Sequence, residues 1–299
     1  MLNILVFPGF LFLFACAMFF QWADRKLYAR LQSRVGPPWY QPFADFVKLL
    51  AKEDVLPEAA DARMCAALSL VTFAAVATAI LYIPVGKAAS YAFEGDLIVV
   101  AFLLWVPILA LSLAGWLSVG PFGLVGSMRA LTQLFAYEVP FLMALCGPAL
   151  LASSWSISEI AAFQTDHIWT AAVQPIGLLV ALTSLVSKLE RVPFDIPEAD
   201  TEIVAGVLTE FSARKLALFR LALDMEMVVC CVLLVNLFLG GFSSLFLLGL
   251  KTMLVLFALS CIRALFARLR LDQMVRLSWG VLAPLSLLQL MMVVWMGVF

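Results

Sequence analysis

The sequence has few charged residues and a single histidine. Asp, Glu, Lys and Arg make up 13% of the 299 residues and hydrophobic residues 64%, whereas soluble domains carry roughly 25% charged and about half apolar residues. This composition excludes a soluble domain and indicates an integral membrane protein. A lone histidine, His167, argues against a histidine proton relay or a His-ligated metal site. The lack of any run of basic residues argues against a nucleic-acid partner.

The cysteines also lack the spacing of a metal site. All six lie in apolar segments without a CxxC pair: Cys16, Cys65, Cys146, Cys230, Cys231 and Cys261. Buried single thiols account for them better than metal ligands do. We therefore expect this chain to bind no metal, cluster or haem.

Hydropathy predicts an all-α membrane protein that forms one membrane domain over residues 1–299. About eight stretches are apolar enough, over about 20 residues, to cross a bilayer. They cover residues 3–22, 64–84, 97–119, 137–153, 168–187, 224–241, 244–266 and 277–298. Two shorter stretches, 41–53 and 122–135, are expected to be interfacial helices; in the first, apolar residues recur at helical spacing opposite charged ones.

The basic residues are distributed unevenly between the connections. Seventeen of the nineteen Lys and Arg residues lie in every second connection between spans or at its edges, and only Lys87 and Lys251 lie elsewhere. Because basic connections stay in the cytoplasm, both termini are predicted to lie on the outer side of a prokaryotic cytoplasmic membrane. The cytoplasmic connections 23–63, 120–136, 188–223 and 267–276 then form one face.

One connection gathers six carboxylates in the stretch LERVPFDIPEADTEIVAGVLTEFSARK, residues 189–215. Its prolines predict entry into a helix, on which Glu198, Glu202 and Glu210 would share one face. Gly206 takes the missing step and allows a close backbone approach. Two carboxylates about 6 Å apart at a dielectric of about 20 repel by roughly 3 kcal/mol, so a shielded row would hold a proton. A solvated loop is the alternative.

Further candidate residues lie at the span ends. Glu138 is expected at the mouth of the fourth span, where a membrane-level acid usually faces a cavity or a partner, unless it reaches interfacial water. Asp224 and Glu226, at the beginning of the sixth span, raise the same alternatives. Lys251 either extends to the outer headgroups or takes part in ion transfer.

The first connection has the features of a docking platform. Gly36, Pro37 and Pro38 form a rigid turn with three arginines before it, and an amphipathic helix follows. A solvated loop explains the charges but not the turn. A cytoplasmic protein partner is therefore the favoured interpretation. The arginines concerned are Arg25, Arg30 and Arg34.

Four segments resemble successive signatures of one family. They read ARLQSRVGPPWYQPFADFVKLLAKED, SMRALTQLFAYEVP, PFDIPEADTEIVAGVLTEFS and RALFARLRLDQMVRLSWGVLAPLSL, and they extend in order over about residues 22–290. The family is the H subunit of respiratory complex I, called subunit 1 in the mitochondrial NADH dehydrogenase. It includes the paralogue in energy-converting membrane-bound nickel-iron hydrogenases.

The resemblance implies an eight-helix anchor without a redox centre or catalysis of its own. Peripheral large and small subunits carrying iron-sulfur clusters, and a nickel-iron centre in hydrogenases, dock on it, and antiporter-like membrane subunits adjoin it. In complex I this subunit forms much of the quinone tunnel and begins a charged path. The positions that match the family's polar or acidic pattern are Glu138, Arg191, Asp195, Glu198, Asp200, Glu202, Glu210 and Asp224.

Three positions depart from the family pattern. Only three residues separate Pro37 from Gln41, where quinone-linked members have a longer insertion; Lys188 stands where a Glu is usual, and Phe211 where a Tyr is usual. The short loop and the opening DRKLYARLQ look more like the hydrogenase branch, in which ferredoxin supplies electrons, than like the alternative of a quinone-reducing complex. A self-contained transporter is disfavoured because no inverted repeat is present.

Overall fold

The computed structural model describes residues 2–86, 89–166, 168–241 and 244–295, and these residues form helices and connections without a strand. In chain order the helices are α1 (Leu2–Leu5), α2 (Phe10–Leu31), α3 (Gln41–Ala51), α4 (Ala62–Tyr82), α5 (Asp96–Leu103), α6 (Val106–Leu117), α7 (Pro121–Ala152), α8 (Ile157–Asp166), α9 (Thr170–Val173), α10 (Pro175–Lys188), α11 (Asp200–Ile203), the 3-10 helix η1 (Gly206–Glu210), α12 (Ala213–Phe238), α13 (Leu245–Leu265), α14 (Leu271–Leu277), the π-helical turn η2 (Ser278–Leu282) and α15 (Ala283–Trp295). The expected all-α membrane fold is confirmed.

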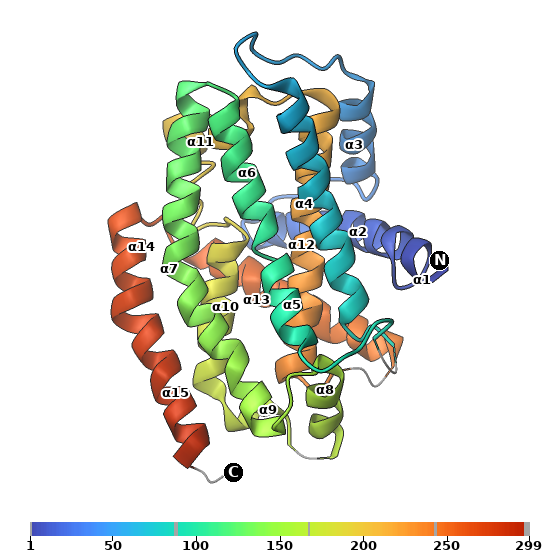
Figure 1. Ribbon diagram of the computed structural model, residues 1–299, viewed down its shortest axis with the longest axis vertical. Helices are drawn as coiled ribbons and strands as arrows, with labels where there is room; N and C mark the ends of the chain where they lie inside the picture. Colours follow the sequence, from blue (N-terminus) through green and yellow to red (C-terminus); the bar gives the residue numbers. More distant parts are fainter. Residues whose placement is uncertain (1, 87–88, 167, 242–243, 296–299) are drawn as a thin grey trace.

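Six helical stretches in the described residues are long and apolar enough to cross a membrane. They are α4, α5 with α6, α7, α12, α13, and α14 continued through α15. Two of the eight expected spans differ. The 14-residue helix α10 is only about 21 Å long, and α2 contains Asp24, Arg25 and Lys26 within its last turns. Figure 1 shows α2 lying across the direction of α4, α7 and α12.

α12 forms the centre of the bundle. Within its most apolar window 89% of the residues are buried, and it packs against α2, α3, α4 and α13. A helix that is apolar on all sides is expected to be covered on all sides. Near its middle, Glu226 is consequently buried and Asp224 is half-buried, whereas Arg214 and Arg220 in its first turns are exposed.

The interfacial helix expected at 41–53 is confirmed as α3, whereas the one expected at 122–135 is wrong. Residues 121–152 form the single 32-residue helix α7, which continues through Pro140 and Pro148. Small residues in its first half, Gly123 and Gly126 among them, allow α6 and η1 to pack closely against it. As a result Glu138 lies in the middle of a helix and not at the mouth of a span.

The expected acidic helix is also wrong. Residues 189–199 form turns, α11 has four residues, and η1 follows a break at Val204 and Gly206, which have φ values of 65° and 52°. Glu198, Glu202 and Glu210 therefore share no helical face. The physical reason is tertiary packing: Val207 and Leu208 are buried in an apolar cluster with residues of α6 and α12.

The four predicted cytoplasmic connections lie against one another. The backbone N–H of Val55 donates to the Ser212 hydroxyl at 2.7 Å, and the N–H of Leu269 donates to the Pro193 carbonyl at 2.9 Å. The connection from α3 to α4, the turn from α6 to α7 and α11 gather at the end opposite α8 and α9 (Figure 1). The assignment of this end to the cytoplasm stays a prediction.

Gly126→Ala tests the close packing of α7 against η1. A Cβ at Gly126 would lie 2.8 Å from the backbone nitrogen of Val207, so η1 must move. We expect a loss of stability of about 1–3 kcal/mol, measured as a lower thermal midpoint in detergent, with faster proteolysis within 189–212. Gly249→Ala is the control, because a Cβ there meets nothing within 4 Å. Equal midpoints for both variants would contradict the packing argument.

Candidate functional site

A cavity lined largely by charged side chains lies between α2, α12, α13 and the connection that follows α10. Its volume is about 480 Å³. Ten of its fifteen lining residues are charged, six of them acidic and four basic. The charged lining residues are Asp24, Arg25, Glu190, Arg191, Asp195, Glu198, Arg220, Asp224, Glu226 and Arg263. We call this space the polar cavity.

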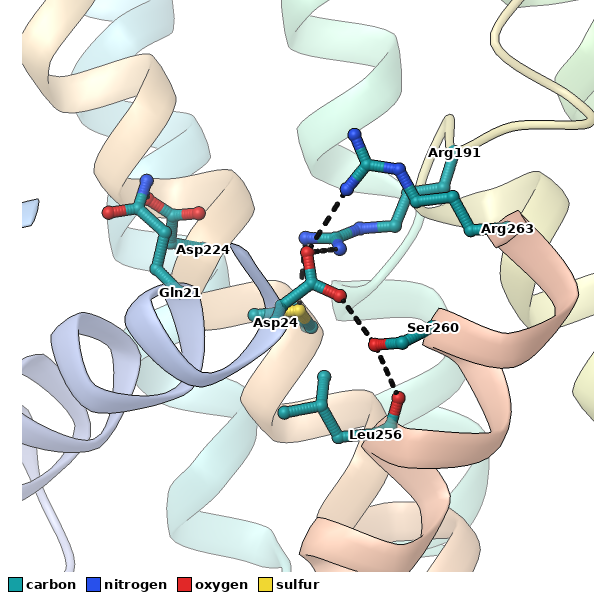
Figure 2. A network of polar contacts seen from close by, with 8 residues as sticks. Gln21, Asp24, Arg191, Asp224, Leu256, Ser260 and Arg263 are labelled. Atoms are coloured by element: carbon teal, nitrogen blue, oxygen red, sulfur yellow. Dashed lines mark hydrogen bonds and ion pairs between the residues drawn. The ribbon is translucent and has the colours of Figure 1, made fainter. Parts of the chain in front are cut away.

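Asp24 joins three segments at the edge of the polar cavity. It is 2% exposed and forms ion pairs with Arg191 and, at 3.2 Å, with Arg263. The Ser260 hydroxyl donates to its other oxygen at 2.9 Å. Figure 2 shows the two guanidinium groups and the hydroxyl converging on this carboxylate. This one buried acid thus connects α2, the 189–199 connection and α13.

Asp224 lies beside this group on α12. Its Oδ2 accepts a hydrogen bond of 2.6 Å from the Gln21 amide, one turn before Asp24 (Figure 2). Arg191 extends between the two acids and also contacts the Met227 sulfur at 3.1 Å. The carboxylates of α2 and α12 therefore share the field of one guanidinium.

A second group of charges is buried at the inner side of the cavity. Lys188 Nζ lies 3.7 Å from Glu138 Oε2 and 3.9 Å from Glu226 Oε1. All three residues are at most 4% exposed. We call Glu138, Lys188 and Glu226 the buried triad. It brings the end of α10 against the middle of α7 and of α12.

Backbone and aromatic groups position the ammonium. Lys188 Nζ donates to the Leu104 carbonyl at 2.8 Å and lies 5.5 Å from the centre of the Tyr137 ring and 5.8 Å from that of Phe141. The carbonyl is free because it stands at the break between α5 and α6. A cation over aromatic faces gains about 0.5–2 kcal/mol, which helps to hold Lys188 away from water.

The polar cavity and the buried triad are contiguous. Glu226 belongs to both, and Glu190 lines the cavity two residues after Lys188. Desolvation by burial raises the pKa of Glu190 well above its ordinary value, with smaller contributions from Glu198, Glu226 and Asp195. Burial of Glu190 thus favours its protonated form. The arrangement offers protonatable groups in sequence from α2 through α12 to α7.

The predicted residues fall into two groups. Asp195, Glu198 and Asp224 line the polar cavity, Arg191 pairs with Asp24, and Glu138 belongs to the triad. Gly206 does lie close to backbone, since a Cβ there would overlap the Pro197 carbonyl oxygen. The side chain of Asp200 lies outside the described residues.

Glu202 and Glu210 lie apart from the cavity. Glu202 is exposed and pairs with Arg129 at 2.6 Å, and this hydrogen bond lowers the pKa of the Glu202 carboxyl. Glu210 lies against Gly120 in the turn between α6 and α7. Both acids belong to the surface formed by the four connections.

The docking candidates are also separated. Arg25 lines the polar cavity and pairs with Asp45 at 3.1 Å, whereas Arg30 and Arg34 are exposed at and just beyond the end of α2. At the other end of the protein, Lys251 donates to the Gly241 carbonyl at 3.2 Å and lies 5.2 Å from the Trp169 ring centre. No carboxylate of the described residues pairs with it.

Sequence reasoning missed Asp24 and Lys188, the residues through which the charged groups of the site are connected. In the sequence Asp24 is only the first residue of a polar loop, although an acid that follows an apolar helix is a signal. In the sequence Lys188 stands out only as a departure from the family pattern, and nothing nearby indicates which residues it would pair with. No group of three or more His, Cys, Asp or Glu side chains in the described ranges could hold a metal ion.

Comparison with known proteins identifies the family. A family model described as NADH dehydrogenase matches residues 3–294. The chain belongs to this family. It is 36% identical over 289 residues to the H subunit of the NADH-quinone oxidoreductase of Anoxybacillus flavithermus, covering 90% of this chain and 85% of the relative. The H subunit of the same enzyme from Geobacillus kaustophilus is 35% identical over 291 residues, with 90% and 86% covered.

A solved structure extends the family comparison. A chain of the membrane-bound sulfane sulfur reductase, an archaeal respiratory membrane complex, matches with a TM-score of 0.89 at 27% identity, covering 95% of this chain and 96% of that one. The resemblance to the H-subunit family is thus confirmed. The chain is a multi-pass membrane subunit of the complex I type. The two curated relatives above are bacterial subunits of an oxidoreductase, so the membrane of this chain is the cytoplasmic membrane.

Asp24→Asn tests whether Asp24 connects the three segments. Removing its charge leaves Arg263 without an ionic partner and Arg191 dependent on Asp224, and breaking a buried pair costs about 3–5 kcal/mol. We expect a lower thermal midpoint of the purified protein and loss of the contact between α2 and α13. Asp45→Asn is the matched control, because its pair with Arg25 is one-third exposed and is worth about 0–1 kcal/mol. Similar losses in both variants would contradict the assignment.

Glu190→Gln tests the protonated acid in the cavity. Because the folded pKa is raised above the ordinary value of 4.5, the folded state binds more protons, and stability falls as pH rises above 4.5 toward the folded pKa. The slope is at most about 1.4 kcal/mol per pH unit. We expect thermal midpoints measured from pH 5 to 8 to fall less for Glu190→Gln than for wild type. Glu58→Gln, an exposed acid, should keep the wild-type profile; a Glu190→Gln profile identical to wild type refutes the idea.

Proposed function

We propose that the chain is the anchoring and coupling subunit of a redox-driven, ion-translocating complex that takes electrons from ferredoxin, as membrane-bound hydrogenases do. Redox centres belong to peripheral large and small subunits, which dock on the four connections. The chain relays charge from that face into the bundle, where antiporter-like subunits receive it.

The observation that carries this proposal is that two groups of buried and half-buried charges meet at one cavity. The first runs from Asp24 through Arg191 to the polar cavity, and the second from Glu226 through Lys188 to Glu138. Buried charges are costly and are kept where they serve a function. Because each step joins a different helix, a change at one end alters the electrostatic balance at the next.

The surface formed by the connections supports docking. Trp39 and Val35, in the turn between α2 and α3, are 76% and 75% exposed. Large apolar side chains that project from a polar surface are typical of a protein interface. The exposed pair of Glu202 and Arg129 adds polar groups to the same end of the protein. A peripheral subunit that covers this face would also seal the opening of the polar cavity.

The nature of the cavity favours a reaction without quinone. Pockets for apolar ligands are lined mainly by hydrophobic side chains, whereas two-thirds of this lining is charged. Phe211, at the place where the family pattern has a tyrosine, is buried and packs on the Phe219 ring with centroids 5.3 Å apart. It offers no hydroxyl to a quinone headgroup.

A quinone-reducing complex is the second candidate. A cavity of about 260 Å³ lies between α2, α3 and α12, and Met18, Phe46 and Leu49 give it an apolar wall. It shares Arg25 and Asp224 with the polar cavity. An amphiphilic ligand could enter there, and the relatives cited above are named for quinone reduction.

The two candidates differ in what the intact complex reduces. The complex, purified through a tag on this chain, is supplied with reduced ferredoxin or NADH as donor, and with protons, polysulfide or a short-chain quinone as acceptor. We expect ferredoxin-driven hydrogen or sulfide formation, with ion uptake when the complex is in liposomes.

Two results would decide against the proposal. Quinone reduction that is blocked by quinone analogues assigns the chain to the second candidate. Electron transfer without uptake of protons or sodium ions by tight liposomes removes the coupling role and leaves an anchor only.

A further inference from the structure

The ammonium of Lys188 stands between two carboxylates without a close contact to either. Its distances to Glu138 and Glu226 differ by only 0.2 Å, at 3.7 and 3.9 Å, and both exceed a hydrogen-bond length. One of its three protons goes to the Leu104 carbonyl. Neither Glu138 oxygen lies within hydrogen-bond geometry of a donor among the described residues, although the buried Trp105 N–H and the Lys188 ammonium are its neighbours. The ammonium is thus shared between the two carboxylates.

The charges of the buried triad do not balance by themselves. Two carboxylates and one ammonium sum to −1 in a place where every member is at most 4% exposed. An uncompensated buried charge costs several kcal/mol, so one additional proton is favoured on one of the acids. Lys188 then pairs with whichever acid is ionised. Two arrangements of equal net charge result.

The side chain of Lys188 can change between these arrangements. It has a flexible four-carbon stem and a compact charge, and it is the last residue of α10. The next residues form the connection in which Glu190 lines the polar cavity and Arg191 pairs with Asp24. A movement of that connection therefore reaches Lys188 through two or three residues of backbone.

We propose that Lys188 is a two-position switch whose ammonium pairs alternately with Glu226 and with Glu138 as one proton passes between these acids. This inference rests on the coupling function proposed above. When Glu226 gives its proton to Glu138, Glu226 becomes the anion and the ammonium moves to it. When the proton leaves Glu138 for the next acceptor, Glu226 takes up a new proton from the polar cavity that it lines, and the ammonium returns to Glu138. The proton moves inward and the ammonium moves against it, so the triad stays neutral.

A charge-matched variant separates this switch from a structural ion pair. Lys188→Met combined with Glu226→Gln leaves one acid that is neutral with one proton, so the triad keeps its net charge and the complex can assemble. With reduced ferredoxin as donor in proteoliposomes, we expect at least tenfold fewer protons or sodium ions taken up per electron transferred. A double variant with the wild-type ratio overturns the switch.

Lys251→Met is the matched control. This lysine also lies within a span, but its Nζ contacts the Gly241 carbonyl and no carboxylate of the described residues. It should keep the wild-type ratio of ions to electrons. A loss as large as that of the double variant would show that removing any lysine at membrane level uncouples the complex, and would overturn the assignment to Lys188.

Infrared spectroscopy provides a readout that a structural role would not change. Reduction-induced difference spectra of the wild-type complex should contain paired loss and gain of protonated-carboxyl bands. Glu138→Gln or Glu226→Gln should each remove both bands, because the proton loses either its source or its destination. If each variant loses only one of the two bands, the proton exchange between Glu138 and Glu226 is overturned. A wild-type complex that transfers electrons without ion uptake overturns the coupling function instead.

Discussion

A charge inside an apolar helix bundle has to be neutralised by a group from another segment, and this constraint determines both the fold and the site. Asp24 illustrates it: its carboxylate on α2 is satisfied by Arg191, Arg263 and Ser260 from two other segments. α2 can therefore remain helical through its polar end and cross the bundle. Without these partners the same residues would have to reach the membrane surface.

The constraint also explains why the two groups of charge are adjacent. Lys188 ends α10, and Arg191 follows it after a single turn, so the buried triad and the Asp24 group are held by opposite ends of one short segment. Glu226 pairs with Lys188 in the buried triad and also lines the polar cavity. A segment with neutral residues at these positions would break the electrostatic link between the Asp24 group and the buried triad. The charge path is thus a consequence of which residues close this connection.

Hydropathy predicted the helical membrane fold and α3, because apolar length and helical spacing depend only on neighbouring residues. Hydropathy failed where contacts between residues far apart in the sequence determine the local structure. The acids of 198–210 suit a helix, yet burial of Val207 and Leu208 against α6 and α12 imposes a break at Gly206. Asp24 and Arg263 are 239 residues apart, so no local pattern pairs them. Glu138 was expected at the beginning of a helix, whereas α7 begins at Pro121 and places it in the middle of a helix.

The lysine at position 188 changes the chemistry that the site can perform. The family resemblance implies an acid there. Three acids within about 4 Å would require nearly three protons to stay neutral, because each additional buried anion is repelled by the others. With an ammonium in place of the third acid, one proton is enough, and the remaining charge is carried by a group that cannot leave the protein. Under the switch proposed above, one exchangeable proton and one cation that stays in the protein take the place of several exchangeable protons, and this would fix the number of charges moved in each cycle.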